Sequence, residues 1–315
     1  MEEINYKVLV KCITFNHAPY IVDCMNSFTM QKTDFPYICC IIDDASTDGE
    51  PDIIRKYIQE NFNLEDESVV RIEETNDYVF WLAQHKTNKN CYFAVYLLKY
   101  NHYSVKKDKM QYVLEWCKNS KYTALCEGDD YWISASKLQK QVDFMECHPN
   151  HSLCFCAHRN LYSSGKFRDV LRYDDNNEFC PMEDMILGGG SYMATNSMLF
   201  KNSMYESYEV WAKDSPIGDI PIMLTLAVNG HVGYISDVMC VYRVMSSGSW
   251  NQRMASDYKK RYIHYRAMLK VFNQFDEYTG YRYHKTVLLK KRKYKKNYVK
   301  GLLKSVLSGI RTFLK

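Results

Sequence analysis

The sequence predicts an α/β fold in which a mixed, mostly parallel β-sheet is flanked by helices. The first observation is that short continuous apolar runs, typical of strands covered on both faces, alternate with segments in which apolar residues recur at helical spacing. The second is that polar clusters rich in Asp and Gly follow these runs, where the strands of an open α/β sheet end. This alternation indicates parallel strands joined by crossover helices.

The first 75 residues supply three strands and two helices. Asn16 is expected to cap the first helix, and Pro19 is expected to lie in its first turn. In chain order, the expected elements are a strand at 7–14, a helix at 21–28, a strand at 37–42, a helix at 52–62 and a third strand at 69–72. The run at 37–42 is continuously apolar, which predicts a strand buried on both faces.

The pattern continues less regularly after residue 75. Residues 75–120 give no clear element, whereas Ser136 is expected to cap a helix that Pro149 ends. The further expected elements are strands at 121–126, 152–157, 191–200, 231–235 and 238–244, and helices at 136–147, 220–229 and throughout 255–315. The sequence contains no internal repeat and no low-complexity linker.

Composition excludes several classes of protein. With 315 residues, of which 46% are hydrophobic and 25% charged, the chain is expected to be globular and not disordered. No window approaches the about 18 to 20 apolar residues of a transmembrane helix. The twelve cysteines form no C-x-x-C pair, and Cys154 with Cys156 lacks a second pair of zinc ligands. We therefore expect reduced cysteines and a cytoplasmic protein.

The net charge of +4 is unevenly distributed. Residues 281–315 contain twelve Lys or Arg and no Asp or Glu, which leaves −8 on residues 1–280. Lysines interleaved with apolar residues over 282–315 predict an amphipathic helix, either at the anionic inner face of the cytoplasmic membrane or packed on the protein body. Nothing else in the sequence supports binding to nucleic acid.

Acidic side chains follow two of the predicted strands. Asp43 and Asp44 follow one, and Glu127, Asp129 and Asp130 follow another within C-E-G-D-D-Y-W. If the two strands are neighbours, these carboxylates converge and repel one another unless a cation or hydrogen-bond donors lie among them. Mg²⁺ or Mn²⁺ binds one or two carboxylates together with substrate phosphates. A polar turn after a strand is the alternative explanation.

Four ordered motifs resemble the inverting glycosyltransferases of family 2. They are I-T-F-N (13–16), I-I-D-D-A-S-T-D-G (41–49), C-E-G-D-D-Y-W (126–132) with K-L-Q-K-Q-V-D-F-M (137–145), and G-D-I-P-I (218–222). The resemblance extends from about residue 6 to residue 245. It implies a GT-A (Rossmann-like) fold and the following division of the chain: a catalytic domain at 1–250, with a nucleotide-binding half at about 1–132 and an acceptor half at about 133–250, and a helical basic tail at 251–315.

The resemblance implies a nucleotide site and a metal site at the strand ends. Phe15 would stack on the nucleotide base, and Asp44 would accept a hydrogen bond from it. The nucleotide-binding residues that it implies are Thr14, Phe15, Asn16, Asp43, Asp44, Lys109, Asp129 and Arg243. The ligands that it implies for Mn²⁺ or Mg²⁺ are Glu127, Asp129 and Asp130.

Two of these assignments have alternatives. The stretch 77–105 is longer than in typical family members, so Lys106 and Lys107 compete with Lys109 for contact with the diphosphate. Arg243 is suited to pair with phosphate, and together with the S-S-G-S-W loop (246–250) it is expected to close over the nucleotide. An ordinary surface arginine is the alternative.

On the acceptor side, the resemblance implies that Asp219 is the catalytic base. A carboxylate there would take the proton of the attacking hydroxyl, although a helix N-cap would also explain the residue. Tyr131 and Trp132 are expected either to face the sugar or to pack beneath the acidic motif. Gly189 and Gly190 resemble the acceptor-side loop of the family, where glycine allows close approach of the backbone.

The implied function is transfer of one sugar from a nucleotide sugar, expected to be a UDP-sugar, to a glycan or lipid-linked acceptor in bacterial lipopolysaccharide or capsule synthesis. The Gln-x-x-Arg-Trp motif of processive synthases is absent, which favours addition of a single sugar. A catalytically silent nucleotide- or sugar-binding protein is the alternative. A sugar-phosphate nucleotidyltransferase is a weaker one, because F-N-H-A-P-Y stands where that class has a Gly-rich, Arg-containing signature.

Overall fold

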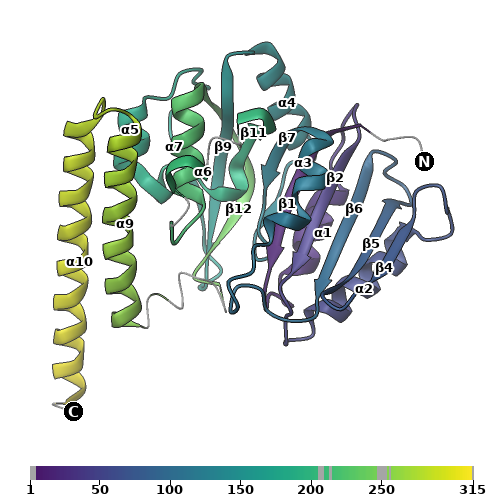
Figure 1. Ribbon diagram of the computed structural model, residues 1–315, viewed down its shortest axis with the longest axis horizontal. Helices are drawn as coiled ribbons and strands as arrows, with labels where there is room; N and C mark the ends of the chain where they lie inside the picture. The colour runs from purple at the N-terminus through teal and green to yellow at the C-terminus, as the bar shows by residue number, and fades with distance from the viewer. Residues whose placement is uncertain (1–4, 205–208, 213–214, 247–253, 255–256, 314–315) are drawn as a thin grey trace.

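The computed structural model describes residues 5–204, 209–212, 215–246, 254 and 257–313. Over these residues, twelve strands form one mixed sheet in the order β3-β5-β6-β2-β1-β7-β11-β9-β12-β8, with β10 paired to β9 and β4 paired to β5. Helices flank the sheet, and two long helices stand side by side at one end of the molecule (Figure 1). The predicted α/β class is confirmed.

The strand and helix alternation predicted for the N-terminal segment is confirmed. β1 (Tyr6–Thr14) pairs in parallel with β2 (Tyr37–Asp43) on one side and with β7 (Ser120–Leu125) on the other. α1 (Ile21–Thr29) connects β1 to β2, and α2 (Glu50–Asn61) follows β2. Every residue of β2 is buried, which explains its continuous apolar run.

The prediction of a third parallel strand at 69–72 is wrong. Residues Arg71–Glu74 form β4, an exposed strand that pairs antiparallel with β5 (Tyr78–His85). On the side away from β1, the parallel neighbour of β2 is β6 (Cys91–Leu98), whose eight residues are all buried. β5 and β6 form an antiparallel pair inside the stretch 75–120, where the sequence shows no clear pattern.

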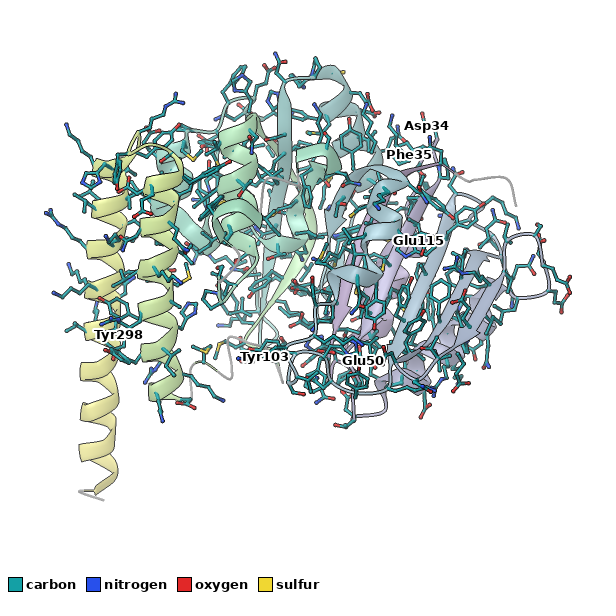
Figure 2. All side chains as sticks on the ribbon, in the orientation of Figure 1. Asp34, Phe35, Glu50, Tyr103, Glu115 and Tyr298 are labelled. Carbon is teal, nitrogen blue, oxygen red and sulfur yellow. The ribbon has the colours of Figure 1, made fainter. Side chains whose placement is uncertain are left out.

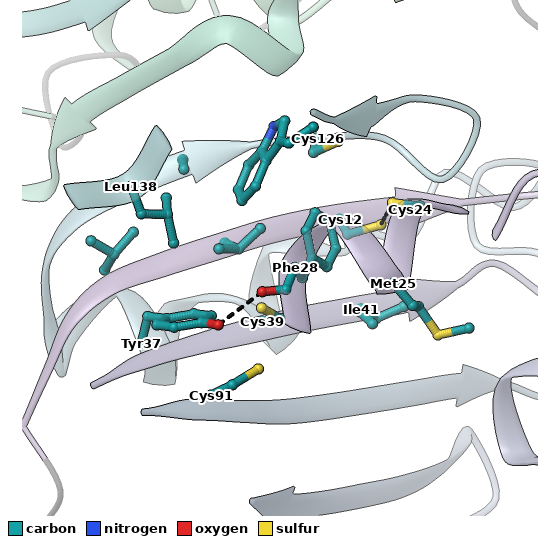
Figure 3. Close-up of a cluster of buried hydrophobic side chains, with 14 of the residues drawn as sticks. Cys12, Cys24, Met25, Phe28, Tyr37, Cys39, Ile41, Cys91, Cys126 and Leu138 are labelled. Atoms are coloured by element: carbon teal, nitrogen blue, oxygen red, sulfur yellow. Dashed lines mark hydrogen bonds between the residues drawn. The ribbon is translucent and has the colours of Figure 1, made fainter. Parts of the chain in front are cut away.

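Alternate residues of the central strands face two different hydrophobic layers. Cys12 of β1 packs in one layer with Cys24 and Phe28 of α1 (Figure 3). Leu9 of the same strand packs in the opposite layer with Trp116. All twelve cysteines are free, as predicted, and the contact between Cys12 Sγ and Cys24 Sγ is a non-bonded one of 3.9 Å. The cysteines therefore serve as small apolar residues of the core.

The second half of the sheet is mixed. β11 (Met198–Lys201) pairs antiparallel with β7 and with β9 (His151–Tyr162), whereas β12 (His231–Val244) runs parallel to β9. The two strands predicted between residues 231 and 244 are one strand, with register shifts around Ile235 and Val238. The remaining elements before the C-terminal pair are β3 (Phe62–Asn63), η1 (Met110–Tyr112), α3 (Leu114–Lys118), β8 (Tyr131–Trp132), α4 (Lys137–Cys147), β10 (Phe167–Val170), α5 (Met182–Gly188), η2 (Gly189–Ser191), η3 (Thr195–Ser197), η4 (Asn202–Met204), α6 (Glu209–Ala212) and α7 (Asp219–Asn229).

The C-terminal segment forms two helices, α9 (Tyr258–Tyr278) and α10 (His284–Phe313). Phe272 and Phe275 of α9 and Val287 of α10 are fully buried in a core cluster that also contains residues of α5, α7, β9 and β12. Among the described residues, no helix combines the length and apolar character needed to cross a bilayer. The side chains of residues 302–315, which belong to the predicted amphipathic stripe, lie outside the described part of the chain.

Candidate functional site

The carboxyl ends of β1, β2 and β7 meet at one edge of the sheet. Thr14 ends β1 in register with Asp43 at the end of β2, and its carbonyl accepts a 3.0 Å hydrogen bond from Asp44 N. After β7 the chain returns to β1, where Gly128 N donates to Ile13 O over 3.3 Å. Three of the sequence motifs are therefore neighbours at a place where open α/β sheets bind ligands.

Gly128 is required by the close approach of this loop to β1. A Cβ built on Gly128 would lie 2.0 Å from Thr14 Oγ1 and 2.5 Å from Thr14 Cβ. Thr14 is 1% exposed, and its hydroxyl is hydrogen-bonded to Glu50 and His17, so the side chain has no room to move aside. The glycine of E-G-D-D therefore sets the separation between the acidic motif and β1.

Glu50, which the sequence motifs did not single out, joins the loops after β1 and β2. It is fully buried at the start of α2 (Figure 2). Its carboxylate accepts hydrogen bonds from Thr14 Oγ1, from His17 N at 2.8 Å and from Ser46 Oγ at 2.9 Å, which offset its desolvation. Because Thr14 and His17 lie far away in the sequence, the only local signal was an acidic residue in a first helical turn, which predicts no more than a helix start.

Asn16 is not the helix cap that the sequence predicts. Its backbone is left-handed, with φ of 57°, and its Oδ1 accepts a 2.8 Å hydrogen bond from Thr47 N. Its own N–H donates to Ser46 Oγ over 2.8 Å. α1 begins after Tyr20 without a side-chain cap. Asn16 thus fastens the loop after β1 to the loop after β2, and Phe15 beside it is partly buried.

Asp43 and Asp44 are both buried but have different partners. Asp43 Oδ2 accepts from Ser46 N at 3.1 Å, whereas its Oδ1 has no partner among the described residues. Burial raises the pKa of Asp43 to about 7. Asp44 accepts from His102 N at 2.7 Å and from Lys109 Nζ at 2.9 Å, so it anchors the segment after β6.

Of the three competing lysines, Lys109 is the one that lies at these strand ends. Lys107 pairs with Asp77 over 2.7 Å, and Lys106 is exposed with a φ of 57°. The fold therefore places Lys109, through its contact with Asp44, beside the loops that carry the acidic motifs.

The end of β12 covers the acidic motif. Asp130 is 2% exposed, and its Oδ1 accepts a 2.8 Å hydrogen bond from Arg243 N. The guanidinium of Arg243 donates to Asp129 O at 2.7 Å and to Asp23 Oδ2 at 2.5 Å. Asp129 Oδ2 accepts from Ser246 Oγ at 2.5 Å. Burial raises the pKa of Asp130, and the nearby charge of Asp129 adds to the effect.

The two rings that follow the motif have different environments. Arg243 lies over the ring of Tyr131, 4.5 Å from its centroid. Trp132 is 1% exposed, its indole N–H donates to a backbone carbonyl at 3.0 Å, and its ring packs against Phe28. The sugar-facing position expected for Trp132 is therefore wrong, because the ring fills the core beneath the motif. Of the loop expected to close with Arg243, residues 247–250 lie outside the described structure.

A cleft of about 1090 Å³ opens beside these strand ends, and Glu127 and Asp219 both line it. Asp219 is the first residue of α7, and Gly218 is the N-cap residue, so Asp219 is not the N-cap that the alternative explanation required. Burial raises the pKa of Asp219, and the N–H of Ile220 opposes that shift. No ion pair within the described residues includes Asp219. A second depression, of about 640 Å³, contains none of the predicted site residues.

Glu127 faces the same cleft and is reached by solvent there. The walls of the cleft nevertheless displace enough water to raise the pKa of Glu127 to about 7, with repulsion from Asp129 adding to this and Lys11 opposing it. The charge of Asp219 makes a small contribution to this raised pKa, so the two carboxylates interact within the cleft.

The predicted glycine turn lies against Asp219. A Cβ on Gly190 would lie 3.1 Å from Asp219 Oδ2. Gly189 has a φ of 57°, and a Cβ there would lie 2.6 Å from Lys290 Nζ of α10. Both glycines therefore permit a close approach, one to the carboxylate and one to a lysine that no sequence motif had connected with the site.

The acidic motif supplies the oxygen donors that Mn²⁺ or Mg²⁺ prefers. The carboxylates of Glu127, Asp129 and Asp130 interact unfavourably, and a cation would offset this repulsion. Across the part of the chain that the structure describes, no group of three or more His, Cys, Asp or Glu side chains is arranged to enclose a metal ion. A site of one or two carboxylates completed by substrate phosphates needs no such group, so the donor set fits a divalent ion in that form.

Sequence comparison identifies one family and a set of relatives. Residues 10–78 match the model of glycosyl transferase family 2, which confirms the resemblance over that segment. The uncharacterized proteins Rv1520 of Mycobacterium tuberculosis and Mb1547 of Mycobacterium bovis are each 29% identical over 250 residues, or 76% of this chain. The chain spans 59% of the length of these relatives.

Solved structures with the same fold include S. aureus TarS and the mannosyltransferase PcManGT. S. aureus TarS in complex with UDP-GlcNAc has a TM-score of 0.55 at 13% identity, covering 85% of this chain and 66% of TarS. The mannosyltransferase PcManGT from Pyrobaculum calidifontis, in complex with GDP-Man and Mn²⁺, has a TM-score of 0.55 at 13% identity, covering 96% of this chain and 75% of PcManGT. At these identities the likeness is one of fold, and the fold is GT-A-like, as predicted.

Proposed function

We propose that this chain, which carries a glycosyl transferase family 2 segment at residues 10–78 within a GT-A-like fold, is a metal-dependent inverting glycosyltransferase that transfers one sugar per reaction. The observation that most supports this function is that Glu127, from the acidic motif, and Asp219, from the start of α7, line one cleft at the strand ends. Asp219 forms no ion pair among the described residues, so its carboxylate is available to a substrate.

The donor is proposed to be a nucleotide sugar, with a UDP-sugar as the first candidate. Structures of TarS contain UDP or UDP-GlcNAc, and the PcManGT structure contains GDP-Man. The buried Oδ1 of Asp43, which has no hydrogen-bond partner within the described ranges, would be satisfied by a donor N–H of a base. The residues proposed to bind the nucleotide are Thr14, Phe15, Asn16, Asp43, Asp44, Lys109, Asp129 and Arg243.

A divalent ion, Mn²⁺ or Mg²⁺, is proposed to bind at Asp129 and Asp130, with Glu127 beside them; the PcManGT structure contains Mn²⁺. When bound, such an ion offsets the negative charge of the leaving diphosphate. The chain itself contributes the Arg243 guanidinium, which lies against Asp129 and adds a second positive charge near that group.

Asp219 is the proposed base of the transfer step. The acceptor oxygen forms a bond to the anomeric carbon while the bond from that carbon to the diphosphate oxygen breaks, and the nucleoside diphosphate leaves with the bonding electrons. The hydroxyl proton passes to the Asp219 carboxylate. Attack from the face opposite the leaving group inverts the configuration at the anomeric carbon.

The proposal is tested with a panel of UDP- and GDP-sugars, measuring nucleotide release with and without candidate acceptors. We expect release with one donor class in the presence of Mn²⁺ or Mg²⁺, and loss of at least about 99% of it after EDTA treatment, restored by adding the metal back. Nucleotide binding without release across the whole panel would instead support the catalytically silent alternative.

The acceptor is proposed to be a glycan or lipid-linked saccharide of bacterial surface polysaccharide synthesis. Residues of α7 and of the glycine turn line the same cleft as residues of the strand ends, which supports an acceptor half over 133–250 within a catalytic domain of 1–250. The basic segment 251–315 is the proposed tail of this domain.

We further propose that the exposed basic face of α10 contacts anionic membrane, with the protein on the cytoplasmic side. Lys295, Lys296 and Lys300 are exposed, and each such charge near lipid contributes about 1 kcal/mol. Deleting residues 282–315 would remove the buried Val287, so charge substitution is the better test.

Replacing these three lysines by Glu is expected to weaken sedimentation with phosphatidylglycerol liposomes by at least about 3 kcal/mol in binding free energy. Neutral phosphatidylcholine liposomes serve as the control. Equal sedimentation of the wild-type protein with the two kinds of liposome would argue against membrane contact.

A further inference from the structure

We propose that α9 and α10 form a binding subsite for an anionic acceptor, namely a saccharide that carries a phosphate or carboxylate near the hydroxyl that receives the sugar. This proposal deepens the proposed function and rests on it, because it takes Asp219 as the residue beside that hydroxyl. It assigns to the C-terminal helices a role in choosing the substrate.

Both helices turn one face into the cleft that contains Asp219 and Glu127. The cleft-lining residues of α10 recur every three or four positions, as one face of a helix requires: Lys290, Lys293, Tyr294, Asn297 and Tyr298. The cleft-lining residues of α9 have the same spacing: Arg261, His264 and Tyr265. The lysines of α10 therefore differ in position: Lys290 and Lys293 line the cleft, whereas Lys295, Lys296 and Lys300 are exposed outside it.

The charge lining the cleft is predominantly positive. Among the described lining residues, the cations outnumber the carboxylates by five to two. The cations are Lys11, Arg168, Arg261, Lys290 and Lys293, and the carboxylates are Glu127 and Asp219. An anionic group on the acceptor would interact favourably with this positive charge.

Lys290 and Lys293 show where the anionic group would lie. Lys290 is 4% exposed, and its Nζ donates to Leu187 O at 2.9 Å, next to the turn that contacts Asp219. Burial, together with a smaller repulsion from Lys293, lowers the pKa of Lys290 to about 8. An anion between the two ammonium groups would relieve this repulsion, at the acceptor side of the cleft and away from the acidic motif.

Aromatic rings complete this wall of the cleft. Tyr265 of α9 stacks on Tyr298 of α10 with centroids 4.6 Å apart and planes 7° apart, and Figure 2 labels Tyr298 at this level of the helix pair. Tyr294 lies beside Lys290, 5.1 Å from its ammonium group. Rings next to cations suit a ligand with both sugar rings and negative charge. The cleft, at about 1090 Å³, is at the upper end of the range for small-ligand pockets, which favours an acceptor of more than one sugar.

The test measures acceptor binding to the 315-residue chain saturated with UDP and Mn²⁺, so that anions are kept from the nucleotide site. Glucose, glucose 6-phosphate and glucuronic acid serve as probes in calorimetry or ligand-observed NMR. We expect the two anionic sugars to bind at least tenfold more tightly than glucose. The phosphate and carboxylate arms show which anion the subsite prefers.

Lys293→Glu is the informative variant, because Lys293 is exposed and its substitution leaves the core intact. It should abolish the tenfold preference, whereas Lys295→Glu, the same change on an exposed position outside the cleft, should keep it. Three results would overturn the proposal: equal binding of neutral and anionic sugars, no binding of glucose 6-phosphate at about 20 mM, or equal behaviour of the two variants. Because binding is measured without turnover, failure of the proposed enzymatic activity would appear separately, as absence of nucleotide release in the donor panel.

Discussion

Replacing Asp219 by Asn is expected to lower kcat for sugar transfer by about a thousandfold, with a much smaller change in the KM for the donor. A positioned general base contributes about 10² to 10⁴ in rate, and Asn has nearly the same shape without the ability to take a proton. Asp219 lies in the cleft at the start of α7. Initial rates of nucleotide release with saturating acceptor measure both constants.

The same carboxylate gives the reaction a defined dependence on pH. Burial raises the pKa of Asp219 above the ordinary value for Asp, and a base works only when deprotonated. Wild-type kcat should therefore fall as pH decreases through this raised pKa, and the residual activity of the Asn variant should lack that acidic limb.

Asp184→Asn is the matched control for this substitution. Asp184 lies in the first turn of α5, in the same half of the protein, and is exposed. Its replacement should leave kcat within about twofold of wild type, as expected for surface substitutions away from a site. If Asp219→Asn retains more than a tenth of the wild-type kcat, Asp219 is not the base.

Gly128→Ala is expected to destabilise the protein by about 3 kcal/mol and to abolish most nucleotide release. The new methyl group would lie 2.0 Å from Thr14 Oγ1, so the loop after β7 must move away from β1. That movement would carry Glu127, Asp129 and Asp130 out of position relative to Asp43 and Asp44. Urea unfolding followed by circular dichroism measures the loss of stability.

Gly301→Ala provides the comparison for glycine replacement. A Cβ at Gly301 meets nothing within 4 Å, and alanine is favoured over glycine inside a helix such as α10. Stability should stay the same or rise by up to about 1 kcal/mol. Gly128→Ala with wild-type stability would show that the two loops are further apart than the structure has them.

The parts of the fold that follow from local pattern were predictable. β2 is a continuous run of mostly apolar residues with both faces covered, and β1 is apolar except for Lys7, Lys11 and the terminal Thr14, so the burial of both strands follows largely from composition. β6 is equally buried, but it comes after its antiparallel partner β5. The short apolar run at 69–72 comes soon after α2 in the chain, as the third strand of a regular strand–helix alternation would, and the sequence pattern therefore favours it as that strand. The choice between two apolar runs depends on long-range pairing, which no local window contains.

The site was predictable where motifs end strands and unpredictable where distant segments meet. Asp43 and Asp44 lie at the end of β2 and the E-G-D-D residues follow β7, and these two strands flank β1 on either side in the sheet. The network around Glu50 depends on residues more than thirty positions earlier in the chain, and the packing of Trp132 depends on what lies beneath it. A motif identifies the residue types at a site, whereas burial decides which of them face the ligand.

The packing of α9 and α10 affects how acceptor choice can evolve. Lys290 lines the cleft but is buried, and its ammonium group lies 5.8 Å from the ring centroid of the core residue Phe272, so a mutation there that altered the acceptor would also endanger folding. Lys293 and Asn297 line the same wall but are exposed. Divergence toward new acceptors should therefore accumulate first at these two positions, with Lys290 changing last.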